Sequence, residues 1–376
     1  MKGKNIVVGI DIRDLKIAKT GTKTYLEEIC RAFQTDRPGF KFYFFDTIFP
    51  IYSGKNKLLK LVEHLRFSIW KQIIIPILAL TRGCDIIFCT DFFVPYVKLG
   101  YETIPVFHDA FFWEYPEHYH KLWRKIFHTL GVSAAKKSAY VIAPTEYAKE
   151  RIAHYSGLAE SKIIAIPEAP KTLISNHSLS TGVLNLKTKK YFLHIGTFEK
   201  RKNLCYLVEA LHLLREQGYN DYSLVLCGQI SPKNPTNGSQ ELFEVVNKYN
   251  LHDYVIMPGY VKDDDLSWYY RNAELYLFPS VNEGFGLPIL EAFQNNLPVL
   301  VANNTCLPEV GGDAVITFDP YNPEDLVKNI VHLLDNQELR AKFIESGRNR
   351  LVDFSWEKTA NELLEVFKKA KTTPSA

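Results

Sequence analysis

The sequence lacks an apolar run long enough to cross a bilayer. The longest, residues 73–80, is interrupted by Pro76 and falls far short of the roughly 20 residues that a membrane-spanning helix needs. The apolar run near the start, residues 5–10, is too short for the core of a signal peptide and is typical of a buried strand. We therefore expect a soluble, cytoplasmic protein.

Cysteines are few and scattered, which argues against a disulfide framework or a zinc site. Of the six, Cys84 and Cys89 form the only close pair, and no second pair or histidine doublet completes a metal-ligand set. Because free cysteine packs as a small hydrophobic residue, we expect buried, reduced thiols. We predict no metal site.

Several catalytic motifs are also absent. The sequence contains no GxGxxG, Walker, HExxH or GxSxG pattern, so it gives no support for a Ser or Cys triad.

Charge is unevenly spread, since the net +3 divides into +8 over residues 1–175 and −5 over residues 176–376. A basic half can face an anionic partner or membrane surface, although an unevenly charged solvated surface gives the same count.

Short apolar runs alternate with longer amphipathic segments along all 376 residues, a length suited to two domains. Near-continuous apolar strands separated by helices predict parallel sheets covered on both faces. The predicted strands are 5–10, 41–45, 85–89, 103–107, 140–143, 191–195, 223–227, 255–257, 275–278, 298–302 and 314–318. We expect two doubly wound α/β domains, 1–175 and 176–356, joined by a linker at 171–190 and facing each other across a cleft. The last helix, 357–370, is expected to pack back on the first domain.

In doubly wound domains ligands lie beyond the carboxyl ends of strands, so the loops there carry the chemistry. After the strand at 275–278, Glu283 precedes two glycines, and Pro288 opens a helix that holds Glu291. A helix start binds anions, whereas carboxylates beside it suit hydroxyl groups. A sugar nucleotide supplies both. The alternative is that the two acids merely favour the helix dipole.

The loop after the strand at 191–195 begins with Gly196 and places Arg201 and Lys202 before the next helix. Adjacent cations at a strand end suit a diphosphate, although a solvated basic turn has the same composition. In the first domain, Gly21 precedes a helix where backbone could approach a phosphate. His108, after the strand at 103–107, could face a substrate, although a lone histidine is more often structural.

Together these loops resemble glycosyltransferase family 4, the retaining enzymes of the GT-B fold. The specific signal is the Glu-x7-Glu segment within a GFGLP turn, and the resemblance spans nearly the whole chain. The motifs are HDAFFWEYPE at 108–117, PTEYAK at 144–149, GTFEKRKNL at 196–204, LFPSVNEGFGLPILEA at 277–292, LPEVGGDAVITFDP at 307–320 and FSWEKTA at 354–360. The subgroup resembled has a GTxEPRKN-like loop and includes many mannosyl- and rhamnosyltransferases of surface-polysaccharide assembly.

The resemblance implies catalytic roles for four residues. Glu283 is implied to contact the transferred sugar, Arg201 and Lys202 to hold the diphosphate, and His108 to reach the donor sugar from the acceptor-binding domain. It also implies a donor site in which Glu291 contacts the ribose and the Gly259 segment the base. The implied donor-binding residues are Gly21, Gly196, Gly259, Tyr260, Val261, Gly284, Phe285, Gly286, Leu287 and Glu291.

Two departures from the family pattern affect this transfer. Lys200 stands where a proline usually precedes Arg201, and Lys23 stands where the first loop commonly has a second glycine. Lys200 could loosen the turn or add a third cation. Lys23 could obstruct the assumed phosphate path or contact phosphate itself. Of the roles that the resemblance implies, that of Gly21 is therefore the least secure.

We therefore expect a metal-independent, retaining hexosyltransferase that uses a UDP- or GDP-linked sugar and no cofactor. Its first domain is expected to bind a glycan or lipid-linked acceptor in surface-polysaccharide or glycoconjugate assembly, and no nucleic acid. The basic, apolar helical stretch 55–80 could rest on the inner face of an anionic membrane, or pack into the core. The alternatives are a non-catalytic nucleotide-sugar or carbohydrate-binding protein and, on the same fold, a nucleotide-sugar epimerase or a phosphorylase.

Overall fold

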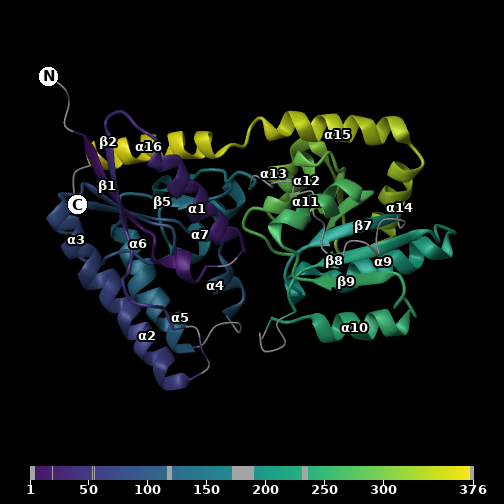
Figure 1. Ribbon diagram of the computed structural model, residues 1–376, viewed down its shortest axis with the longest axis horizontal. Coiled ribbons are helices and arrows are strands. Elements are labelled where there is room, and N and C mark those ends of the chain that lie inside the picture. The colour runs from purple at the N-terminus through teal and green to yellow at the C-terminus, as the bar shows by residue number, and fades with distance from the viewer. Residues whose placement is uncertain are drawn as a thin grey trace. The chain divides into compact units, whose positions relative to one another are not determined.

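The computed structural model describes residues 5–18, 20–52, 54, 56–116, 121–171, 190–230 and 236–372. The chain divides into two compact units, one of residues 1–168 with 356–376 and the other of residues 169–355 (Figure 1). Most of the predicted linker, together with Lys55 and Glu117, lies outside the described residues.

The first unit is built on parallel strands. Its main sheet has the order β2-β1-β3-β4, and a bridge between Val106 and Ile142 joins β4 to the parallel pair β5-β6. The strands are β1 (Ile6–Asp11), β2 (Phe40–Phe45), β3 (Ile86–Cys89), β4 (Glu102–Pro105), β5 (Val141–Ala143) and β6 (Ile163–Ala165). The central strands β3 and β4 are buried along their whole length, as parallel strands covered on both faces should be.

Helices connect these strands. They are α1 (Thr20–Gln34), α2 (Lys57–Ile69), α3 (Ile75–Arg82), α4 (Phe111–Glu114), α5 (Lys121–Ile126), α6 (Ser133–Lys137), α7 (Glu146–Ser156) and α16 (Trp356–Thr372). Two π-helical turns, Trp70–Ile74 and Phe127–Val132, interrupt longer helical stretches. The C-terminal helix α16 packs on this unit against α1, β1 and β3, with Leu363 and Phe367 in the core (Figure 1).

The second unit has one six-stranded parallel sheet of order β12-β11-β10-β7-β8-β9. Its strands are β7 (Lys190–Ile195), β8 (Tyr222–Cys227), β9 (Val255–Gly259), β10 (Leu275–Phe278), β11 (Val299–Ala302) and β12 (Val315–Phe318). Its helices are α9 (Leu204–Glu216), α10 (Ser239–Lys248), α11 (Asp263–Asn272), α12 (Leu287–Gln294), α13 (Leu307–Gly311), α14 (Pro323–Leu334) and α15 (Gln337–Leu351). The prediction of α/β units with parallel sheets is confirmed.

The strand order fixes where each unit can bind a ligand. From β7 the chain runs outward through β8 and β9, then returns to place β10 on the other side of β7. Right-handed crossovers in opposite directions put their helices on opposite faces and leave a crevice between the first strands. The corresponding crevices lie at the carboxyl ends of β7 and β10 in the second unit, and of β1 and β3 in the first.

Candidate functional site

Three charged side chains from two distant loops meet at the β7–β10 crevice. Glu283, in the loop after β10, accepts from Lys202 Nζ at Oε1 (2.5 Å) and from Arg201 Nη1 at Oε2 (3.0 Å). Both cations belong to the short 3₁₀ turn Lys200–Lys202 after β7. All three side chains are largely buried, with 9 to 17% of their surface exposed. The sequence patterns indicated each of these three residues but not their pairing with one another.

Electrostatics keep this cluster ionised. Burial by itself would raise the pKa of Glu283, but Lys202 and Arg201 outweigh it and hold the pKa at about 2. Burial lowers the pKa of Lys202, and Glu283 opposes that shift. The arrangement therefore places two positive charges against the Glu283 carboxylate at a strand end, with Arg201 also paired to Glu199.

Further contacts fix the two loops against each other. The Val281 N–H donates to the Arg201 carbonyl (2.8 Å), and Arg201 Nη1 donates to the Asn282 carbonyl (2.9 Å). The buried Cys306 thiol donates to the carbonyls of Glu283 (3.3 Å) and Phe285 (3.2 Å), and these contacts stabilise the turn at residues 283–285. Cys306 has no local sequence signature for this role and was missed.

A buried histidine, His194, lies close to the Lys202 side chain. His194 Nδ1 donates to the Leu277 carbonyl (2.9 Å), which leaves Nε2 unprotonated and, among the described residues, without a hydrogen-bond partner. Burial, and then Lys202, lower the pKa of His194 to about 4, so the ring is neutral. A Cβ on Gly196 would lie 3.1 Å from this Nε2, and one on Gly228 would lie 1.7 Å from the Gly196 carbonyl oxygen. Backbone therefore passes here at a separation that only glycine allows.

The GFGLP turn leads directly into α12. Gly286 has a φ of +108° and precedes Leu287, the first residue of the helix, with Pro288 second. Only glycine adopts this conformation readily, and the first amides of a helix lack partners within it. The side chains of Phe285 and Leu287 are buried in the core, so these residues offer backbone rather than side chain to a ligand.

Glu291 lies just beyond the first turn of α12, where it is half-buried. Its Oε2 accepts from the phenol of Tyr270 on α11 (2.8 Å). Burial raises the pKa of Glu291, which the Tyr270 hydrogen bond partly offsets. At the end of β9, Gly259 has a φ of +80°, Tyr260 is 71% exposed and Val261 is half-buried.

In the first unit, both ring nitrogens of His108 are occupied. Nε2 donates to the Thr90 carbonyl (3.1 Å) and Nδ1 pairs with Glu168 (3.1 Å). Although burial lowers the pKa of His108, the Glu168 contacts raise it overall. The implied contact between His108 and a sugar would require one of these bonds to be exchanged. Gly21 is the second residue of α1 and does not precede that helix.

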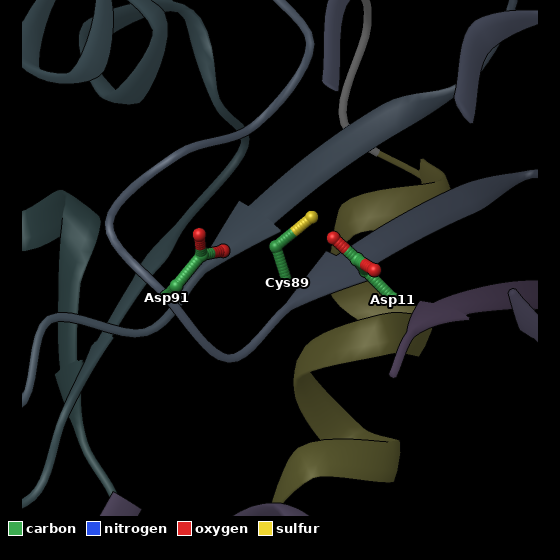
Figure 2. Close-up of side chains that lie close together, drawn as sticks. All are labelled: Asp11, Cys89 and Asp91. Carbon is green, nitrogen blue, oxygen red and sulfur yellow. The ribbon is translucent and has the colours of Figure 1, made fainter. Parts of the chain in front are cut away.

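The β1–β3 crevice of the first unit holds a different cluster (Figure 2). Ligand atoms of Asp11, Cys89 and Asp91 lie within 4.8 Å of one another, a grouping that could hold a metal ion. The buried ammonium of Lys71, however, already lies 2.6 Å from Asp11 and 2.5 Å from Asp91. A single ammonium thus contacts two carboxylates of this cluster. Lys71 belongs to the basic stretch 55–80, and its side chain is buried in the core.

Family comparisons match both halves of the chain. The sequence model described as "Glycosyltransferase Family 4" matches residues 21–169, and that described as "Glycosyl transferases group 1" matches residues 180–350. The chain is 34% identical over 178 residues to O-antigen chain mannosyltransferase B of Escherichia coli, covering 47% of this chain and 45% of that protein. It is 27% identical over 235 residues to serotype-specific mannosyltransferase WbdA of Escherichia coli, covering 60% and 28%. The alignments thus span less than half the length of these relatives.

Solved structures share the fold at low sequence identity. Sucrose-phosphate synthase from Thermosynechococcus elongatus aligns with a TM-score of 0.73 and 17% identity, over 97% of this chain and 99% of that one. Anabaena HepE in complex with UDP and glucose aligns with a TM-score of 0.70 and 15% identity, over 97% and 100%. Two Rossmann-like units of this kind make up the GT-B fold.

Proposed function

Since the chain belongs to glycosyltransferase family 4, we propose that it is a retaining glycosyltransferase. It moves a hexose-type sugar from a nucleotide donor to a glycan or lipid-linked acceptor in surface-polysaccharide or glycoconjugate assembly. The observation that carries the proposal is the buried contact of Arg201 and Lys202 with Glu283 at the switch point of the second unit. Cations for a diphosphate and a carboxylate for sugar hydroxyls occur there together.

Each part of the donor has a matching group in the second unit. Arg201 offers a planar fork and Lys202 a point charge to the diphosphate, next to the amides that open α12. Glu291 has a second carboxylate oxygen for a ribose hydroxyl. The exposed segment at Gly259–Val261 lies at another strand end, where a base could bind.

The two cations also account for catalysis without a metal ion. As the glycosidic bond breaks, negative charge grows on the leaving diphosphate, and fixed positive groups stabilise that charge more in the transition state than in the ground state. Attack from the same face as the departing group retains configuration. The leaving phosphate takes the acceptor proton, so the proposal needs no separate protein base.

A thermal-shift screen across UDP- and GDP-linked sugars tests donor binding, because a ligand bound to the folded state raises its stability. Two relatives are named mannosyltransferases, so GDP-mannose enters the screen first. A stabilising donor is the expected result. No stabilisation by any sugar nucleotide would contradict the proposal.

We also propose that the first unit rests on the inner face of an anionic membrane through one side of α2 and α3. No helix among the described residues could span a membrane. Seven apolar side chains on this stretch, spaced three or four residues apart, are each 38 to 67% exposed; they are Leu58, Leu61, Leu65, Ile69, Ile73, Ile77 and Leu80. The opposite face, with Trp70, Ile75 and Ala79, packs in the core.

The basic residues beside this exposed apolar face favour an anionic lipid surface as its partner. Between residues 56 and 82, Glu63 is the only acidic residue, and it points to Arg13 (2.5 Å). Lys60 and Arg82 are exposed on the same stretch. A helix with apolar and basic residues exposed together binds in the interface of anionic bilayers. Such a position would bring the protein to a lipid-linked acceptor.

A further inference from the structure

The charge balance at Glu283 imposes a competition on any diphosphate that binds. Among the described residues, the hydrogen-bond partner of Lys202 Nζ is Glu283 Oε1, and Arg201 divides its guanidinium between Glu283 and Glu199 (2.8 Å). The two cations proposed for the diphosphate are thus already engaged by a carboxylate of this chain. A phosphate oxygen that binds Lys202 competes with Glu283 for this ammonium and weakens their contact.

The cost of that exchange depends on what else arrives with the diphosphate. A buried carboxylate that loses its cations is strongly disfavoured unless new hydrogen-bond donors replace them. The sugar of an intact donor brings hydroxyl groups that can donate to Glu283. A nucleoside diphosphate that has lost its sugar keeps only its ribose hydroxyls, which in the proposed function meet Glu291 and not Glu283.

We propose that Glu283 discriminates the sugar-bearing donor from the spent nucleoside diphosphate. It competes with the diphosphate for Arg201 and Lys202, and only the sugar hydroxyls compensate it. This inference rests on the proposed function and adds a reason for product release. When the sugar leaves, Glu283 regains its two cations and displaces the nucleotide.

Titration calorimetry with UDP, GDP, UDP-glucose and GDP-mannose tests this in the wild type and in Glu283→Gln. A hydrogen bond to a charged group changes a binding constant by about 10- to 100-fold. We therefore expect Glu283→Gln to bind the nucleoside diphosphate at least about tenfold more tightly than the wild type. The intact donor should gain much less, so that the preference for donor over product falls.

The matched control is Glu199→Gln, which removes a carboxylate from the same guanidinium but leaves Glu283 on both cations. We expect it to change nucleoside diphosphate affinity much less. Equal gains in the two variants, or no gain in Glu283→Gln, would overturn the proposal while leaving the proposed function intact. If the wild type binds none of the four nucleotides, the proposed function fails and this inference fails with it.

The Gln variant leaves Lys202 buried beside a neutral amide, so its folding is checked first by circular dichroism. If it does not fold, Glu283→Asp replaces it. The shorter side chain keeps the charge but cannot reach both cations as closely, and nucleoside diphosphate should again bind more tightly than in the wild type. An unchanged or weaker affinity in Glu283→Asp would likewise overturn the proposal.

Discussion

Tyr270 donates its phenolic hydrogen to Glu291 across two helices of the second unit, at a distance of 2.8 Å. The Tyr270 ring is fully buried, so the hydroxyl has a fixed position. Fixing one carboxylate oxygen orients the other, and in the proposed function that second oxygen meets the ribose. Tyr270 is then a positioning residue for Glu291.

Tyr270→Phe keeps the ring packing and removes this hydrogen bond. We expect nucleoside diphosphate affinity to fall roughly tenfold, since hydrogen bonds to charged groups contribute about 1.5 to 3 kcal/mol. The KM for donor should rise with little change in kcat. Tyr191→Phe is the control, because its equally buried phenol donates over the same 2.8 Å to a backbone carbonyl, that of Tyr269. Equal losses in both variants would mean a structural role only.

Arg201→Lys tests the planar grip on the diphosphate. The Arg201 guanidinium reaches Glu199 through Nε and the Asn282 carbonyl and Glu283 through Nη1, a set of contacts that one ammonium cannot reproduce. We expect steady-state kinetics to show a kcat at least about tenfold lower, with a smaller change in KM. Parental kcat in this variant would remove Arg201 from the proposed machinery.

Chelation tests metal independence. The proposed charge stabilisation comes from side chains, and in the first unit Lys71 pairs with Asp11 and Asp91, two members of the cluster that could hold a metal ion. Dialysis against EDTA should therefore leave both the transfer rate and the unfolding temperature unchanged. Complete loss of activity that magnesium restores would contradict this part of the account.

The His108–Glu168 pair predicts a pH-dependent stability. The pKa of His108 in the folded protein is raised above the unfolded value of about 6.5. The pair therefore contributes its full stabilisation of the folded state below that pH. The contribution is lost as pH rises through the higher folded value. Urea unfolding followed by tryptophan fluorescence suits this test, since four of the five tryptophans belong to the first unit.

Glu168→Gln should flatten this loss of stability above pH 6.5, whereas His252→Gln, at an exposed site in the second unit, should preserve it. Each pKa unit of the raised value corresponds to about 1.4 kcal/mol. An identical pH profile in Glu168→Gln and wild type would show that the pair does not stabilise the fold.

Membrane contact through α2 and α3 predicts salt-sensitive binding to vesicles. The wild type should co-sediment with anionic vesicles at low salt and be released at high salt. Leu61→Glu combined with Leu65→Glu should abolish binding, whereas Val352→Glu, also at an exposed apolar position, should not. Wild-type protein that stays in the supernatant at low salt would refute the membrane proposal.

How far the sequence predicted the fold differed from element to element. The run 275–278 was predicted with its observed bounds because all four residues are apolar, and the structure buries all four. Strand β6 (Ile163–Ala165) was missed, although it is as long as β5, which was predicted. The stretch 55–80 was predicted as helical, but not its π turn at Trp70–Ile74, where Lys71 pairs with Asp11 and Asp91, far away in the sequence.

The same limit applies to the candidate site. Both loops could be selected, because each follows a buried strand and has a distinctive composition. The pairing of Lys202 with Glu283 joins residues 81 positions apart, and no local pattern encodes it. Tyr270 and Cys306 act through single contacts to the selected residues, so they could be found only in three dimensions.

The most direct test of the central claim measures how fast the enzyme hydrolyses a sugar nucleotide, with water as the acceptor, from the nucleoside diphosphate released. The wild type is compared with Lys202→Ala, both in EDTA. A transferase with its donor site at Glu283 should hydrolyse one donor slowly. Loss of Lys202 should reduce that rate about 10²- to 10³-fold, as removal of one preorganised charge-stabilising group typically does. Donor binding without any release would identify a non-catalytic binding protein, and parental release by Lys202→Ala would place the diphosphate elsewhere.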